Sequence, residues 1–279
     1  MLWKNRRQSG NVEDRRGFGT GKVAIGGIGT IVVAIIIWIL GGNPLEFLGS
    51  GQMNSNQNAS TEIPENDTVA QFVSVVLAET EDVWDSIFQV EGENYTQPKL
   101  IIFRDAIQSA CGMASDASGP FYCPGDQKVY IDLSFFDEMK SRFNAPGDFA
   151  IAYVIAHEIG HHVQNQLGIL NKAQQLKERT DEKGANRIQV KVELQADFLA
   201  GVWAYHISKY KNLLEKGDAE EALGAANAVG DDRLQKQHQG RVVPDAFTHG
   251  TSEQRMRWFM KGYKTGDIRQ GNTLELNNL

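Results

Sequence analysis

Hydrophobic positions recur along the chain with two different spacings, and each spacing predicts a kind of element. Apolar side chains three or four residues apart predict an amphipathic helix within residues 67–88, capped by its first residue. The same spacing recurs after Asp148 and again from about Arg187, which predicts two more helices. Short apolar runs at residues 99–105 and 128–134 predict strands. The pattern therefore predicts the α+β class, mainly helical with a small sheet.

One stretch has no polar face. Residues 23–42 have the sequence VAIGGIGTIVVAIIIWILGG and carry no charge. A helix of this length is long enough to cross the hydrocarbon core of a bilayer, so the sequence predicts one transmembrane helix before the folded domain. A cleaved signal peptide and a buried helix are the alternatives. No Ala-x-Ala-like site follows the stretch, which favours an uncleaved anchor.

Composition and charge divide the rest of the chain. Residues 43–66 are rich in Gly, Ser and Asn, which predicts a flexible linker, and residues 67–279 then form the folded domain. The net charge of the whole chain is -7, but residues 1–22 carry +4. A basic leader next to an anchor favours a single-pass protein of the cytoplasmic membrane, with its N-terminus inside and its domain in the periplasm or outside. The domain shows no basic stripe, which argues against binding to nucleic acid.

Two cysteines, Cys111 and Cys123, are close in sequence. Outside the cytoplasm such a pair can oxidise and close a small loop, so we expect a disulfide. Two unpaired buried thiols are the alternative.

Three histidines and one glutamate occupy six consecutive positions of the helix predicted after Asp148, in a chain with six histidines altogether. His157 and His161 are four residues apart, so they share a face and can bind one ion, with Glu158 beside them. This His-Glu-x-x-His pattern is typical of a zinc ligand pair with its general base. His162 points about a quarter-turn away and is predicted to be a non-ligand. A solvated histidine-rich face is the alternative.

A catalytic zinc takes three protein ligands and leaves a fourth position for water. The third predicted helix carries Glu193 and Asp197, again four residues apart, and two such carboxylates repel each other unless a positive group lies beside them. We expect Glu193 to be the third ligand and Asp197 to accept a hydrogen bond from the distal N–H of a ligand histidine. Two solvated carboxylates, or Asp197 as the ligand, are the alternatives. Zinc is the metal that best matches two imidazoles and a carboxylate.

Five motifs spread over nearly the whole chain carry a family resemblance: NVEDRRG, GPFYCPGDQKVYID, AHEIGHHVQ, ELQADFLAG and FTHGTSEQR. With them the chain resembles the bacterial family of neutral zinc metallopeptidases, and its zinc pattern is similar to that of the wider gluzincins. The resemblance implies a zincin-like metallopeptidase domain that binds one Zn²⁺ per chain and acts on a peptide or an unfolded protein. It also implies that the strand at residues 128–132 is a sheet edge that aligns an extended peptide.

The segment FTHGTSEQR, residues 247–255, resembles the His-Pro-(x)4-Arg segment of membrane-linked gluzincin proteases, with glycine in place of the proline. By this likeness His249 donates a hydrogen bond to the oxyanion formed during hydrolysis. Arg255 then anchors the segment to a buried carboxylate such as Asp197 or Glu193. A histidine unconnected to the site and a surface arginine are the alternatives. The rival donors are His206, His238 and Tyr205.

These observations predict a membrane-anchored zinc metallopeptidase that hydrolyses peptide bonds with metal-activated water and Glu158 as general base. Two other functions fit the same residues. One is a zinc-dependent hydrolase of another amide, such as cell-wall peptide, and the other is a zinc-stabilised binding or scaffold protein in which Glu158 is dispensable. Asp231 and Asp232 are predicted to be a solvated cap or loop pair.

Overall fold

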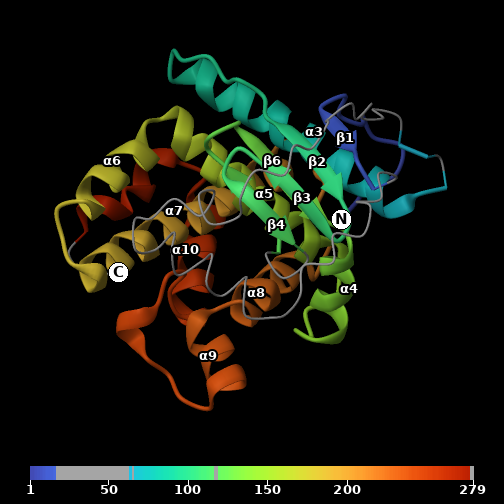
Figure 1. Ribbon diagram of the computed structural model, residues 1–279. Coiled ribbons are helices and arrows are strands. Elements are labelled where there is room, and N and C mark those ends of the chain that lie inside the picture. Colours follow the sequence, from blue (N-terminus) through green and yellow to red (C-terminus); the bar gives the residue numbers. More distant parts are fainter. Residues whose placement is uncertain (17–62, 65, 116–118, 277–279) are drawn as a thin grey trace, which may run out of the picture. The chain divides into compact units, whose positions relative to one another are not determined.

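The structure is a computed structural model that describes residues 1–16, 63–64, 66–115 and 119–276. Met1–Arg15 and Ser60–Leu279 form one compact unit, whose elements are shown in Figure 1. The predicted transmembrane helix at residues 23–42 lies outside the described residues, as does most of the predicted linker. Within the described part of the chain, no helix is both long enough and apolar enough to span a bilayer.

The compact unit combines a small sheet, a hairpin and a set of helices. Its strands are β1 (Val12–Asp14), β2 (Lys99–Phe103), β3 (Ala106–Ser109), β4 (Gly112–Ser115), β5 (Phe121–Cys123) and β6 (Lys128–Asp132). Its α-helices are α3 (Thr68–Val90), α4 (Ser134–Ser141), α5 (Asp148–Gln166), α6 (Ile169–Lys177), α7 (Glu182–Lys209), α8 (Asp218–Ala228), α9 (Asp231–Gln239) and α10 (Ser252–Thr265). Three short 3₁₀ helices complete it: η2 (Pro244–Ala246), η3 (Ile268–Gly271) and η4 (Thr273–Glu275).

The sheet has the strand order β1-β2-β6-β5, in which β5 alone is antiparallel to its neighbour. Successive side chains of a strand point to opposite faces. In β2, Leu100 and Ile102 therefore join the main core, where the helices pack, whereas Ile101 and Phe103 join a second cluster on the other face. Because β6 lies between β2 and β5, the prediction that residues 128–132 form a sheet edge is wrong.

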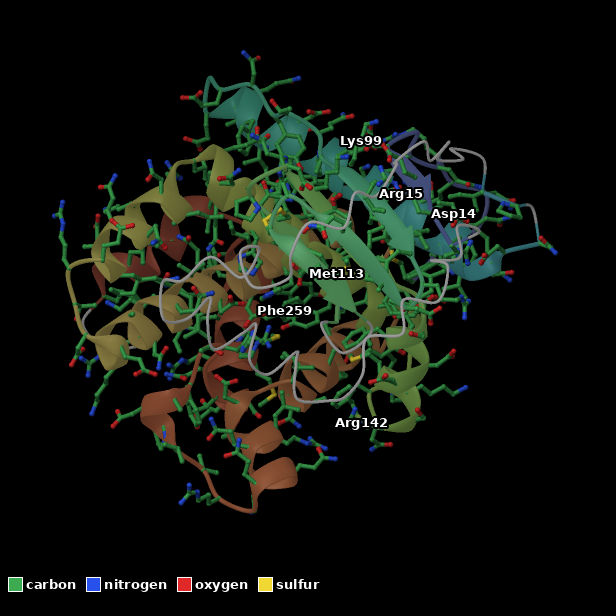
Figure 2. All side chains as sticks on the ribbon, in the orientation of Figure 1. Asp14, Arg15, Lys99, Met113, Arg142 and Phe259 are labelled. Carbon is green, nitrogen blue, oxygen red and sulfur yellow. A yellow bond between two sulfur atoms is a disulfide. The ribbon has the colours of Figure 1, made fainter. Side chains whose placement is uncertain are left out.

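The N-terminal residues belong to this unit and do not form a separate leader. β1 pairs in parallel with β2, and Glu13 of β1 binds both Arg15 and Lys99, which Figure 2 shows beside that edge of the sheet. Arg6 and Arg7 are paired with the buried carboxylates of α3, at 2.6 Å from Glu79 and 3.0 Å from Glu81. The predicted division of residues 1–22 from residues 67–279 is therefore wrong for residues 1–15.

The same pairing corrects the predicted topology. A strand cannot join a sheet across a bilayer, so β1 and β2 must lie on the same side of any membrane to which the chain is attached. An N-terminus inside and a domain outside are incompatible with this sheet. The positive charge that favoured that orientation is instead partly neutralised by carboxylates of α3.

The predicted disulfide is confirmed. Cys111 and Cys123 are bonded, with an S–S distance of 2.00 Å and a Cα–Cα distance of 5.8 Å. Cys111 lies at the tip of the β3–β4 hairpin and Cys123 ends β5, so the bond fastens the hairpin to the sheet. Ile107 of β3 packs on the sheet face that carries Ile101 and Phe103. Sequence alone predicted a loop here, because Gly and Ser are frequent in it.

The helix that carries the histidine cluster is packed on several sides. α5 contacts α3, α7 and α8, and it also lies against β5 and β6. At its crossing with α7, a Cβ on Gly160 would lie 3.0 Å from the Ala196 carbonyl oxygen, so the two helix backbones approach closely there. α7 and α10 approach closely as well, because a Cβ on Gly262 would lie 2.0 Å from the Phe198 carbonyl oxygen. These crossings hold α5, α7 and α10 together.

α7 begins earlier than predicted, at Glu182 and not near Arg187, because Asp181 caps it by accepting from the backbone N–H of Gly184 at 2.8 Å. The polar segment just before it contains a helix of its own, α6, which the sequence analysis did not predict.

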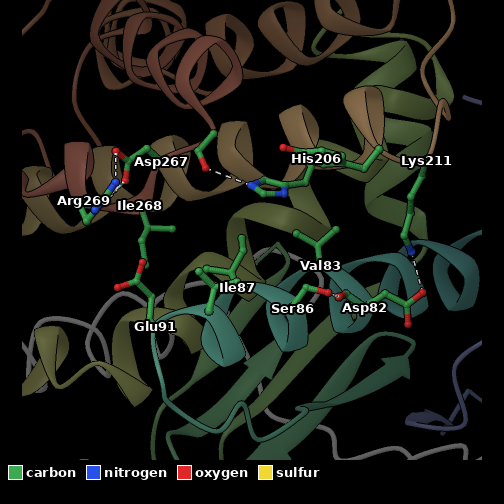
Figure 3. A pocket seen from close by; sticks show the side chains of 13 residues that line it. Asp82, Val83, Ser86, Ile87, Glu91, His206, Lys211, Asp267, Ile268 and Arg269 are labelled. Atoms are coloured by element: carbon green, nitrogen blue, oxygen red, sulfur yellow. Dashed lines mark hydrogen bonds and ion pairs between the residues drawn. The ribbon is translucent and has the colours of Figure 1, made fainter.

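A cavity of about 460 Å³ lies between α3 and the segment from Gly266 to Arg269, as Figure 3 shows. Val83 and Ile87 line it from α3, and His206 lines it from α7. None of its lining residues belongs to the histidine cluster.

Candidate metal centre

Three possible ligand atoms converge between α5 and α7. His157 and His161 are one turn apart on α5, and Glu193 faces them from α7. The Nε2 atoms of His157 and His161 lie 3.2 and 3.3 Å from Oε2 of Glu193. Two ligand atoms bound to a tetrahedral zinc at ordinary distances lie roughly 3.3 Å apart. These three residues therefore fit a zinc ion, as the sequence predicted.

Asp197 orients the first histidine. Its Oδ1 lies 2.8 Å from Nδ1 of His157, and Arg255 donates to both of its oxygens at 2.9 and 3.0 Å. Burial would raise the pKa of Asp197, but the charges of Arg255 and His157 hold it at about 2. An ionised carboxylate only accepts, so Nδ1 of His157 is the donor and Nε2 is the nitrogen that can bind a metal once its own proton is displaced. Tyr153 also donates to Asp197, at 2.5 Å.

A glutamine orients the second histidine. Nδ1 of His161 lies 2.8 Å from Oε1 of Gln164, whose Nε2 donates to the Val192 carbonyl and to Gln195. These contacts fix which end of the Gln164 amide faces the histidine, so Nδ1 of His161 must donate. Gln195 in turn donates to the Gly271 carbonyl. Both imidazoles thus present Nε2 to the same point.

The ionised carboxylate of Glu193 favours the binding of a cation at this centre. Burial would raise the pKa of Glu193, but the charge of His161 and hydrogen bonds from both histidines hold it well below its usual range. Glu158 follows His157 on α5 and is also buried, with 8% of its surface exposed. Burial raises the pKa of Glu158, which makes it a better proton acceptor than an exposed carboxylate. Glu158 is not one of the three converging residues.

His249 lies on a loop that packs against the part of α7 that carries Glu193. Its charge acts on Glu193, and the loop that carries it packs on α7, where a Cβ on Gly250 would touch Val190 and Leu194. Its side chain is 50% exposed, and Nδ1 lies 3.3 Å from Oδ1 of Asp231. Burial would lower the pKa of His249, but the hydrogen bond that its imidazole donates to Asp231 raises it. The imidazole therefore favours the protonated, donating form.

The prediction of a solvated Asp231–Asp232 pair is wrong. Asp231 is buried, and its Oδ2 accepts from the backbone N–H groups of Thr248, His249 and Gly250 at 2.7, 2.6 and 3.0 Å. Asp232 accepts from the backbone and the hydroxyl of Ser252. Local sequence gives no signal for these contacts, because the partners lie 18 and 20 residues later in the chain.

Two of the alternatives to His249 as oxyanion donor lie away from the three ligands. His206 is 13 residues after Glu193 on α7, about 20 Å along the helix, and it donates through Nε2 to the Gly266 carbonyl. Tyr205 is its neighbour. The side chain of His238 lies outside the described part of the structure. His162 is fully buried on another face of α5, where it contacts the Tyr122 hydroxyl and the Thr96 carbonyl, so it is not a ligand.

A second group of acidic residues is also close enough to share an ion, but it differs from the first in its residue types and in its partner. Asp148, Asp218 and Glu221 have carboxylate oxygens close enough to share an ion, but no histidine is among them. The α-ammonium of Met1 lies 3.0 Å from Asp148 and 3.1 Å from Asp218. This group is therefore already paired with a cation.

Sequence analysis missed several residues around the centre. Tyr153 and Gln189 each precede a ligand by four residues, and Gln164 follows one by three, so all three share a helix face with a ligand. That spacing is the signal that could have found them.

Comparisons with known proteins agree with this geometry. The family described as "Putative neutral zinc metallopeptidase" matches residues 1–274. The chain is 50% identical over 283 residues to the uncharacterized protein YpfJ of Escherichia coli (strain K12), covering 98% of each chain. It is 43% identical over 207 residues to the uncharacterized protein Rv2575 of Mycobacterium tuberculosis (strain ATCC 25618 / H37Rv), covering 71% of this chain and 69% of that protein. No solved structure matches the chain.

Proposed function

The chain belongs to the family of neutral zinc metallopeptidases, and from this premise we propose that it hydrolyses peptide bonds with one zinc ion per chain, held by His157, His161 and Glu193. The observation that carries the proposal is the meeting of these three ligand atoms beside the buried carboxylate of Glu158. A metal that only stabilised the fold would need no such neighbour.

The proposed mechanism assigns each proton to a residue. A zinc ion held by these three residues would supply Lewis acidity, which would acidify a water and polarise the substrate carbonyl. Glu158 takes the proton from the attacking water, because its raised pKa suits it to accept and then release a proton. Glu158 then delivers that proton to the leaving amine.

His249 completes the proposed site. It donates from its imidazole to the carbonyl oxygen as negative charge develops there. Asp231 positions that imidazole by contacting Nδ1 and by fixing the backbone of the loop at Thr248, His249 and Gly250. Nε2 is then the atom left to face the substrate.

Metal removal tests the proposal. We expect the zinc-loaded full chain to cleave an unfolded protein, to lose that activity after treatment with a chelator, and to regain it when zinc is restored. Fragment masses from mass spectrometry check that peptide bonds are broken. Cleavage of isolated cell-wall peptides but not of unfolded protein would instead support the alternative amide hydrolase. Cleavage that is unaffected by thorough metal removal contradicts the proposal.

We propose further that residues 1–15 and the domain lie together outside the cytoplasm, because a disulfide persists in an oxidising compartment. Attachment to the cytoplasmic membrane through residues 23–42 stays a prediction, but a single crossing by this stretch would put residues 1–15 and the domain on opposite sides, so a single-pass span is not part of this proposal. Lys4 and Lys216 are exposed and suit cysteine labelling. We expect a membrane-impermeant thiol reagent to label both Lys4→Cys and Lys216→Cys in intact spheroplasts. If Lys216→Cys is not labelled, the domain lies in the cytoplasm. If Lys4→Cys alone is not labelled, the N-terminus lies on the opposite side of the membrane from the domain.

A further inference from the structure

The two oxygens of Glu193 have different partners. Oε2 faces the Nε2 atoms of His157 and His161 at 3.2 and 3.3 Å. Oε1 accepts a hydrogen bond from Nε2 of Gln189 at 2.6 Å. The carboxylate is buried, with 6% of the residue exposed, so neither oxygen rotates freely into solvent. One oxygen is therefore directed to the metal position and the other is held away from it.

Gln189 is placed by the helix and oriented by a lysine. It precedes Glu193 by four residues on α7, so the two side chains share a face. Its Oε1 accepts from the ammonium of Lys177, the last residue of α6. An ammonium group only donates, so the amide oxygen must face Lys177 and the amide NH₂ must face Glu193. The lysine thus determines the direction of the amide.

A neutral amide between the lysine and the carboxylate has a clear chemical advantage. A lysine in direct contact with Glu193 would form an ion pair and compete with a metal for the carboxylate charge. The amide of Gln189 donates one hydrogen bond without a formal charge, so Glu193 keeps its negative charge for the ion. Because Oε1 is turned toward Gln189, Oε2 is the oxygen that faces the metal position. The ion then has three protein ligands and an open position, as a catalytic zinc requires.

We propose that Gln189 is a positioning residue that holds Glu193 as a one-oxygen metal ligand, and that Lys177 acts through Gln189 by setting its direction. This inference rests on the proposed function, because it presupposes the metal centre. It adds a third orienting contact to those that Asp197 and Gln164 make to the two histidines. Each of the three metal ligands is then oriented by a hydrogen bond to a residue that does not itself bind the metal.

Metal affinity and metal spectroscopy test this role. Gln189→Met keeps the side-chain length but removes the donor. We expect it to weaken zinc binding of the full chain by about 10- to 100-fold, measured by competition with a chelator. We also expect its visible Co²⁺ absorption to shift toward a higher coordination number, because both oxygens of Glu193 become free to bind. Gln175→Ala, on the exposed side of α6, is the matched control and should keep wild-type affinity and spectrum.

A double-variant cycle tests the part of Lys177. We expect Lys177→Met to weaken zinc binding in the wild-type background and to have no further effect in the Gln189→Met background, since the lysine acts through the glutamine. Lys177→Arg, which keeps a donor, should retain most of the affinity. The thermal midpoint of each metal-free variant shows whether the fold itself has changed.

The outcomes separate this inference from the function on which it rests. If wild type binds no zinc, the proposed function is wrong. If wild type binds zinc and Gln189→Met binds it equally well with an unchanged Co²⁺ spectrum, the positioning role of Gln189 is wrong. If Lys177→Met weakens binding equally in both backgrounds, the lysine does not act through Gln189.

Discussion

Replacing Glu158 by glutamine should strongly slow peptide hydrolysis while zinc stays bound. Glutamine has nearly the same shape, but its amide cannot take a proton from water, and a general base typically contributes 10²- to 10⁴-fold to a rate. Glu158 is not one of the three converging residues, so its replacement leaves the ligand set intact. We expect kcat to fall by at least about 100-fold, with wild-type zinc content, when cleavage of an unfolded protein is followed.

The same variant distinguishes the enzyme from a scaffold protein. A zinc-stabilised binding protein has no use for a proton acceptor, so Glu158→Gln would leave its binding unchanged. Wild-type cleavage by Glu158→Gln contradicts the assignment of the base. Loss of zinc would show instead that the carboxylate supports the metal centre itself.

Asp197→Ala should destabilise the fold and weaken zinc binding together. Its removal leaves the guanidinium of Arg255, which is 4% exposed, without its buried partner. An unpaired buried charge of this kind costs about 3–5 kcal/mol in the free energy of unfolding. Nδ1 of His157 also loses its acceptor, and such losses lower metal affinity about 10- to 100-fold. Chemical denaturation and chelator competition measure the two effects.

A double variant separates these two effects. In Asp197→Leu/Arg255→Met both charges are gone, so most of the lost stability should return, because a buried ion pair replaced by apolar side chains is often neutral in stability. Zinc affinity should stay low, since His157 still lacks its acceptor. If the double variant is as unstable as Asp197→Ala, the unpaired Arg255 is not the cause of the loss.

The metal ligands were predictable because their chemistry and their helical spacing coincide. His157 and His161 are rare residues placed four apart, and Glu193 with Asp197 repeats that spacing on a second amphipathic helix. A like-charged pair of this kind needs a positive partner, which is the physical reason why the two helices were expected to meet. The structure brings them together at the crossing of Gly160 and Ala196.

The orienting glutamines were not predictable in the same way. Glutamine is common on solvated helix faces, so helical spacing places Gln164 and Gln189 on the same face as a ligand without showing that they orient it. Their role depends on which end of each amide faces a ligand, and partners such as Val192 and Lys177 decide that. Those partners lie 28 and 12 residues away in the chain.

The N-terminal region shows why charge alone can mislead. Arg6 and Arg7 favoured a cytoplasmic leader because they precede an apolar stretch. Their partners, Glu79 and Glu81, lie more than seventy residues later, and β1 finds β2 only through parallel pairing between distant segments. Local sequence carries no signal for such contacts, so the leader seemed separate from the domain.

The metal content of the purified full chain tests the central claim most directly. Elemental analysis of wild type should find one zinc per chain, and His161→Ala and Glu193→Ala should each lose most of it, because each removes one of three ligands. The Gln175→Ala protein, changed on an exposed face of α6, should keep its zinc. A wild-type chain that stays free of zinc at stoichiometric supply, or one whose zinc survives both ligand substitutions, would contradict the account.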